Sequence, residues 1–149
     1  MPASIKILAS NILDLVKRIE WIGPLLVRLT LGLVFVTTGW GKLHSLDTIT
    51  DYFTQLNIPA PHAQAVMVST IEFVGGCLLI LGLGTRIVSV LLVGVMAVAI
   101  YTAKLPELHG VAELAATDEC IYLVAFIWLA VAGAGAASLD HLIARRSRA

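Results

Sequence analysis

The sequence has few charged residues and few cysteines for its length. Lys, Arg, Asp and Glu make up 13% of the 149 residues, whereas soluble domains carry about 25%. These charges are too few to cover the surface of a water-soluble fold. They sum to a net charge of zero, and no basic stripe interleaved with aromatic residues occurs, so we expect no nucleic acid as a partner.

Metal-binding patterns are also missing. Cys77 and Cys120 form neither a CxxC motif nor a zinc-ligand spacing. None of the four histidines pairs with another ligand at i+3 or i+4 in a metal-binding motif. We therefore expect no metal site and solvated histidines.

What the chain does contain is long apolar runs, with 58% hydrophobic residues and a mean hydropathy of +0.92. A membrane-spanning helix needs about 20 mostly apolar residues, and four stretches qualify: 23–42, 63–83, 87–105 and 119–138. The alternative is a soluble bundle, whose helices would show a polar stripe every 3.6 residues. The third stretch has almost no polar residue between Ser89 and Tyr101. The sequence therefore predicts an all-α fold, a bundle of four transmembrane helices.

The N-terminal segment has a different pattern. Over residues 4–20 the apolar side chains share one helical face and the lysines and arginines lie elsewhere. This indicates an amphipathic interfacial helix on the membrane surface; the alternative is an extension of the first span. We divide the chain into this amphipathic segment at 1–22, a four-helix membrane domain at 23–141 and a basic cytoplasmic tail at 142–149.

The distribution of Lys and Arg predicts the orientation, because cytoplasmic flanks carry an excess of both. An even number of spans puts both termini on one side. That side would hold Lys6, Lys17, Arg18, Arg86, Arg145, Arg146 and Arg148, and the other only Lys42 and Lys104. We predict a multi-pass protein in the lipid bilayer of the inner (plasma) membrane, with both termini cytoplasmic.

Two ionisable residues fall inside the spans, where such groups are costly and face the bundle interior. Arg28 lies about five residues into the first span, and Glu72 lies near the middle of the second. Their depths from the same side are roughly 7 and 15 Å at 1.5 Å per residue, a difference that a long arginine can cover. We predict a buried Arg28–Glu72 pair, direct or bridged by water or a ligand. Two interpretations remain open, a structural ion pair and a polar site for a ligand or proton.

Glycines follow the same helical faces. In the first span the face holds Arg28, Gly32, Phe35, Gly39 and Lys42, and in the second it holds Glu72, Gly75, Gly76, Leu79 and Gly82. Because glycines let helices approach closely in membranes, we expect these two faces to meet.

Further polar and aromatic residues gather near the span ends. The predicted rim of a cavity between the helices is Lys42, Tyr101, Lys104 and Glu119. Snorkelling is the alternative explanation for Lys104, as it is for Arg86, and the helix dipole is the alternative for Glu119. The candidate ligand-lining residues are Phe35, Trp40, Phe73 and Tyr122. At the cytoplasmic side, Arg86 and Asp140 form a candidate ion pair.

Taken together, these residues resemble the DoxX family. The resemblance lies in the run from Arg28 to Phe35, in Gly39-Trp-Gly-Lys42, in Glu72-Phe-Val-Gly75-Gly76 and in Leu81-Gly82-Leu-Gly84-Thr-Arg86. It closes with Glu119 and with Ser138-Leu139-Asp140, so it covers about residues 23–141. The resemblance implies a four-helix membrane fold, and it carries over Arg28, Lys42, Glu72, Arg86 and Glu119 without a catalytic role for each.

The family's members imply two classes of function. The first is a quinone-linked or redox-associated membrane subunit with a quinone as the candidate cofactor. Its electrons would come from a redox or stress-response partner protein or from a soluble substrate, because the chain has no haem, flavin or iron–sulfur motif. The alternative is a non-enzymatic accessory that scaffolds a membrane oxidoreductase or a thiol/metal stress complex. A homo-oligomer is a further candidate assembly. A transporter ranks last, because no inverted repeat or broken helix is evident.

Overall fold

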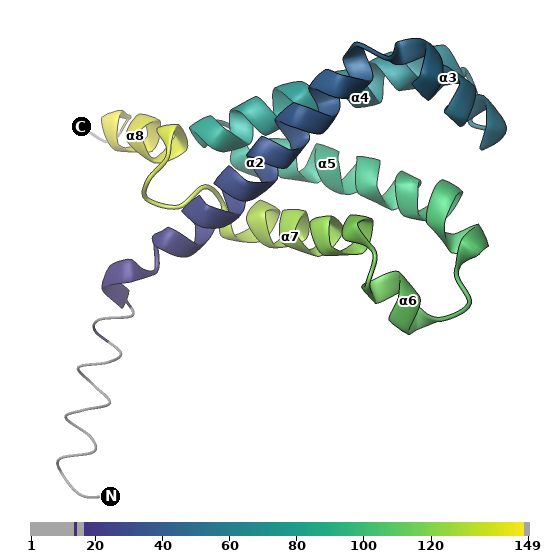
Figure 1. Ribbon diagram of the computed structural model, residues 1–149. Helices are drawn as coiled ribbons and strands as arrows, with labels where there is room; N and C mark the ends of the chain where they lie inside the picture. The colour runs from purple at the N-terminus through teal and green to yellow at the C-terminus, as the bar shows by residue number, and fades with distance from the viewer. Residues whose placement is uncertain (1–13, 15–16, 148–149) are drawn as a thin grey trace, which may run out of the picture.

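The computed structural model describes residue 14 and residues 17–147, and within that part every regular element is a helix (Figure 1). The all-α prediction is confirmed. The helices are α2 (Ile22–Leu43), α3 (Leu46–Gln55), α4 (Pro61–Leu81), α5 (Thr85–Ala99), α6 (Val111–Ala115), α7 (Asp118–Ala132) and α8 (Leu139–Arg146). A π-helical turn at Ile100–Lys104 and a 3₁₀ turn at Leu105–Glu107 continue α5.

Three helices are long and apolar enough to cross a membrane: Lys17–Leu43, Pro61–Leu81 and Thr85–Glu107. They match the first three predicted spans. The predicted amphipathic helix at 4–20 lies for most of its length outside the described residues, and Lys17–Ile19 continue the helical segment ahead of α2.

The fourth helix is shorter than predicted. α7 has 15 residues, about 22 Å at 1.5 Å per residue, and it ends at Ala132 instead of Ser138. Two glycines explain the early end, because Gly133 has φ +84° and Gly135 has φ +76°, which an α-helix cannot accommodate. Residues 133–138 form a non-helical segment. The Ser138 side chain then accepts a hydrogen bond from the His141 N–H and starts α8, so a helix occupies the first half of the predicted tail.

The bundle is built from two antiparallel helix pairs. α2 packs along α4, and α5 packs along α7. We call the end where α2 begins and α5 starts the terminal side, and the end where α2 finishes and α4 starts the loop side. Figure 1 shows that α3 and α6, which both lie on the loop side, are well apart.

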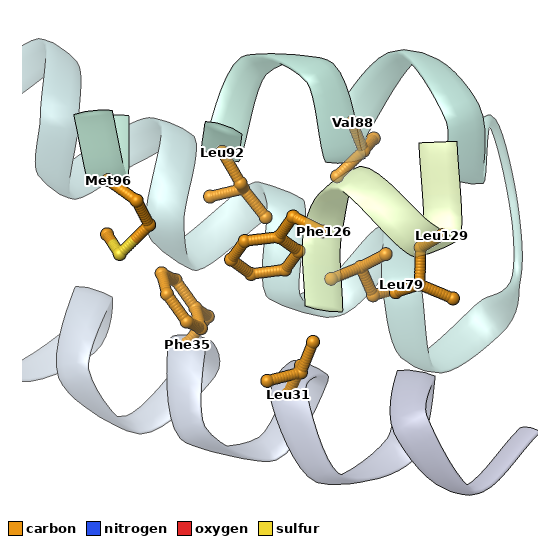
Figure 2. Close-up of a cluster of buried hydrophobic side chains, with 8 residues drawn as sticks. All are labelled: Leu31, Phe35, Leu79, Val88, Leu92, Met96, Phe126 and Leu129. Carbon is orange, nitrogen blue, oxygen red and sulfur yellow. The ribbon is translucent and has the colours of Figure 1, made fainter. Parts of the chain in front are cut away.

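One hydrophobic core joins the two pairs (Figure 2). The Phe35 ring packs edge-on against Phe126, with ring centroids 5.0 Å apart. The buried cluster is Leu31, Phe35, Leu79, Val88, Leu92, Met96, Phe126 and Leu129. Each of the four main helices contributes to it, so this cluster holds the pairs together.

Glycines set the close approach of α2 and α4. A Cβ atom placed on Gly76 would lie 2.6 Å from the Val36 nitrogen and 2.8 Å from the Gly32 oxygen. A Cβ on Gly39 would similarly meet the backbone at Phe73. These neighbours are main-chain atoms and cannot rotate away. The predicted contact between the two glycine-bearing faces is confirmed.

The close contact between α2 and α4 predicts that a methyl group added to a glycine lowers stability at some positions and not at others. Gly76→Ala forces α2 and α4 apart, and we expect it to destabilise the protein by about 1–3 kcal/mol, as for an overpacked core. Gly94→Ala is the matched control, because a Cβ there meets nothing within 4 Å. Thermal unfolding in detergent checks both variants. Equal melting temperatures would contradict the close approach.

Candidate functional site

Arg28 is buried on the terminal side, where it binds the non-helical segment after α7. Its side chain is 1% exposed. Nη1 donates to the Ala134 carbonyl at 2.6 Å, and Nη2 donates to the Ala137 carbonyl at 2.8 Å. Where a chain leaves its helix inside a membrane, its free backbone carbonyls need a hydrogen-bond donor from the protein, because lipid offers none. Arg28 supplies these donors to the segment after α7, and this allows α7 to end within the bundle.

The Arg28 guanidinium leaves no room for a side chain at the end of α4. Gly82 ends α4 with φ +67°, and a Cβ atom there would collide with the Arg28 guanidinium group. A residue with a side chain is thus excluded both by the space and by the left-handed backbone. The Gly82 in the turn between α4 and α5 is part of the Arg28 site.

Asp140 fastens α8 to the same turn. Its carboxylate accepts hydrogen bonds from the Gly84 N–H at 2.7 Å and from the Thr85 N–H at 3.0 Å. Its own N–H donates to the Gly82 carbonyl at 2.9 Å. An acid in this position satisfies free N–H groups at the start of α5 and complements the helix dipole.

The structure therefore corrects the expected ion pair between Arg86 and Asp140. Among the salt bridges of the described residues this pair does not occur. The Asp140 carboxylate is engaged by backbone N–H groups, and Arg86 extends along Gly133 instead. The two residues do lie at the same end of the bundle, but the sequence could not show that backbone donors compete for the acid.

The expected Arg28–Glu72 pair does not form either. Both residues are buried, at 1% and 2% exposure, but they bind different partners. The reason is the register of the antiparallel pair: Arg28 lies against Gly82, whereas Glu72 lies against Gly39. The residues opposite these two positions on α2 are eleven apart, roughly 16 Å along a helix. The prediction assumed that α2 and α4 end at one level, and α2 in fact extends past α4.

Glu72 instead pairs with Lys42 towards the loop side. The Lys42 Nζ lies 2.6 Å from Glu72 Oε1, and the lysine side chain is 34% exposed whereas the glutamate is 2% exposed. Glu72 Oε2 has no hydrogen-bond partner among the described residues, and neither does the Ser69 hydroxyl, which lies three residues earlier on α4. One carboxylate oxygen is thus bound to a partly exposed cation, and the other is buried without a hydrogen-bond partner among the described residues.

The other predicted rim residues form a second ion pair. Lys104 Nζ lies 3.3 Å from Glu119 Oε1, with both side chains partly exposed. The π-helical turn at Ile100–Lys104, a feature frequent at functional sites, carries the lysine. Tyr101 is 74% exposed. The four rim residues therefore divide between the α2–α4 pair and the α5–α7 pair.

The predicted lining aromatics also divide. Phe35 is 3% exposed and packs against Tyr122 at a centroid distance of 5.5 Å, so both belong to the core region. Trp40 and Phe73 pack together at 5.4 Å, and Trp40 is 55% exposed on the outside. Phe73 follows Glu72 in α4. The structure thus leaves only Trp40 and Phe73 beside the Lys42–Glu72 pair.

The chain matches one protein family. The DoxX family profile matches residues 23–105. The chain belongs to the DoxX family. It is similar to "Inner membrane protein YqjF" of Escherichia coli, 26% identical over 130 residues that cover 87% of this chain and 98% of that one. It is also similar to "Putative oxidoreductase CatD" of Bacillus subtilis, 32% identical over 123 residues that cover 82% and 87%.

A third DoxX-like relative is "Uncharacterized membrane protein Rv3486" of Mycobacterium tuberculosis, 34% identical over 135 residues that cover 83% of this chain and 82% of that one. No solved structure matches the chain significantly. The DoxX match spans Arg28, Lys42, Glu72 and Arg86. Among the described residues, no group of three His, Cys, Asp or Glu side chains is placed to hold a metal ion.

Sequence reasoning missed the partners of the two buried charges. Backbone carbonyls leave no side-chain signature, so Ala134 and Ala137 could not be predicted as partners of Arg28. Lys42 had a usable signal: it lies one turn beyond Gly39, and the glycine contact of this DoxX bundle fixes which residues of α4 lie opposite.

We predict that Arg28→Lys destabilises the protein by about 2 kcal/mol. A lysine keeps the charge but presents a compact ammonium in place of the planar fork, so it leaves one of the two carbonyls unpaired, which costs about this much. Thermal unfolding and amide exchange over residues 133–138 measure the effect. Arg18→Lys, at an exposed position, is the control. Unchanged exchange in Arg28→Lys would refute the role of the bidentate contact.

A double-mutant cycle tests the Lys42–Glu72 pair. Lys42→Met leaves a buried carboxylate without its cation, so we expect a loss of about 3–5 kcal/mol. Adding Glu72→Met removes that charge and should restore most of the stability, because apolar replacements of buried pairs are often neutral.

Lys104→Met is the matched control of the cycle. Its pair with Glu119 is partly exposed, and such pairs contribute less than about 1 kcal/mol. Thermal unfolding in detergent gives all values. A double variant as unstable as Lys42→Met alone would rule out a buried charge as the cause.

Proposed function

We propose that this DoxX protein is a quinone-linked, redox-associated membrane subunit, in which Glu72 and Lys42 exchange protons for the redox step. The observation that supports the proposal most strongly is the arrangement at Glu72. Its Oε1 binds a lysine that reaches solvent at 34% exposure, and its Oε2 is buried without a partner. Ionisable residues inside membrane-spanning helices commonly mark ligand sites and proton pathways.

The neighbouring aromatic pair offers a surface for a ring. Trp40 is exposed on the outside of the bundle and packs on Phe73, so a flat apolar ring arriving from the bilayer would contact Trp40 within the turn that carries Lys42. Reduction of a quinone to a quinol takes up two electrons and two protons. Glu72 and Lys42 can deliver protons from the loop side, and the electrons would come from a redox or stress-response partner protein.

The similarity to CatD, whose name describes it as an oxidoreductase, favours this class. The alternative, a non-enzymatic accessory that scaffolds a membrane oxidoreductase or a thiol/metal stress complex, rests on the same fold. It predicts that Glu72 and Lys42 affect stability only. A quinone-dependent signal at Trp40 therefore distinguishes the two.

We also propose that the protein lies in the inner membrane with both termini in the cytoplasm. Arg86, Arg145 and Arg146 lie on the terminal side and the Lys42 and Lys104 pairs towards the loop side, as the positive-inside rule requires. A green fluorescent protein fused to the C-terminus should fluoresce in cells, and alkaline phosphatase at the same site should be inactive. The opposite pattern would reverse the orientation.

Quinone binding is predicted to quench tryptophan fluorescence through Trp40. Titration of the purified protein with a short-chain quinone should give saturable quenching, and Trp40→Phe should remove most of the saturable part. Trp128→Phe is the matched control, because Trp128 is similarly exposed, at 43%, on α7. Glu72→Gln should keep the quenching but weaken quinone affinity several-fold. Linear, non-saturating quenching that is the same in all variants would leave the accessory function as the better explanation.

A further inference from the structure

α8 carries an exposed apolar face that no part of the described protein covers. Leu139, Leu142 and Ile143 have exposures of 37%, 56% and 54%. They occupy positions i, i+3 and i+4 of the helix, which lie on one face. Arg146 at i+7 continues this face, and Arg145 lies beside it, both exposed.

The fold places this helix at the membrane boundary. Asp140 holds the first turn of α8 against Gly84 and Thr85, in the turn where α4 ends and α5 begins. Two of the spanning helices therefore end at the level where α8 begins. Figure 1 shows α8 beside this end of α4, directed away from the bundle.

An eight-residue helix needs a surface to stay folded, because isolated helices shorter than about 12–15 residues are marginal in water. Among the described residues, the hydrogen bonds between α8 and the rest of the bundle are made by Asp140, in the first turn. Leu142, Ile143 and the two arginines lie in the remainder of the helix. A membrane surface with hydrocarbon below and anionic headgroups above would match both the apolar face and the two arginines.

We propose that α8 binds anionic phospholipids of the leaflet on the terminal side. Its leucines and isoleucine enter the boundary between headgroups and acyl chains, and Arg145 and Arg146 bind lipid phosphates. Amphipathic helices with cations beside the apolar face lie on membranes in this way. The charges favour lipid over a protein partner, because the leaflet supplies phosphates beside hydrocarbon at the depth of this turn.

Residues 133–138 join α7 to α8, and Arg28 binds this segment near both of its ends, at Ala134 and Ala137. The protein itself therefore fixes this connection, and the lipid acts on the part of α8 beyond it. This inference is independent of the quinone proposal, since it involves neither Glu72 nor Trp40.

Hydrogen–deuterium exchange of the full-length protein in nanodiscs tests the proposal. We compare discs of phosphatidylcholine alone with discs containing equal parts of phosphatidylcholine and phosphatidylglycerol. Amides of α8 from Leu142 to Arg146 should exchange at least about tenfold more slowly in the anionic discs, because each basic residue strengthens attraction to anionic lipid several-fold. The double variant Arg145→Gln/Arg146→Gln should lose this difference.

Lys17→Gln/Arg18→Gln is the matched control, because it removes the same charge from exposed positions on another segment. It should retain the lipid-dependent slowing. Ile143→Asn should speed exchange in both discs by weakening the apolar face. Equal exchange of the wild-type protein in the two discs, slowing by free phosphate in phosphatidylcholine discs, or equal protection in lipid-free detergent would each overturn the proposal.

Discussion

The hydrogen bonds from Arg28 to two backbone carbonyls are the contacts on which the terminal side depends. A chain that leaves its helix inside hydrocarbon exposes carbonyls that lipid cannot satisfy. Arg28 satisfies those of Ala134 and Ala137, and its guanidinium in turn requires a glycine at Gly82. The turn at Gly82 then offers the N–H groups that Asp140 binds. One buried arginine thus connects α2, the end of α4, the start of α5 and α8.

The parts of this fold that follow from periodicity and length were predictable. Apolar runs of about 20 residues located α2, α4 and α5, and glycines spaced by helical turns located the α2–α4 contact. The residue at which α7 ends was not predictable, because it depends on Gly133 and Gly135 adopting positive φ. The carbonyls of this segment are satisfied by Arg28, and a contact between residues 106 positions apart has no local signal.

The candidate site shows the same limit. Arg28 and Glu72 were recognised as buried charges from their positions in apolar runs, and both are buried. Their partners depended on how far α2 slides along α4. A shift of a few residues changes which cation lies nearest to Glu72, so the sequence indicated Lys42 over Arg28 only through the spacing of the glycines on the two helices. The contacts at Gly39 and Gly76 fix that register.

The two helix pairs differ in how they are held at their ends, and this difference places the chemistry. On the terminal side, Arg28 and Asp140 connect the pairs through backbone hydrogen bonds. Towards the loop side, each pair carries its own lysine–glutamate ion pair, Lys42–Glu72 on α2–α4 and Lys104–Glu119 on α5–α7. Neither ion pair connects one helix pair to the other. Among the described residues, the loop side therefore lacks the hydrogen bonds between helix pairs that the terminal side has, and it contains the buried acid with an unpartnered oxygen. Ligand binding or proton transfer there would leave the Arg28 contacts intact, so the proposed redox site and the proposed lipid contact of α8 depend on separate parts of the bundle.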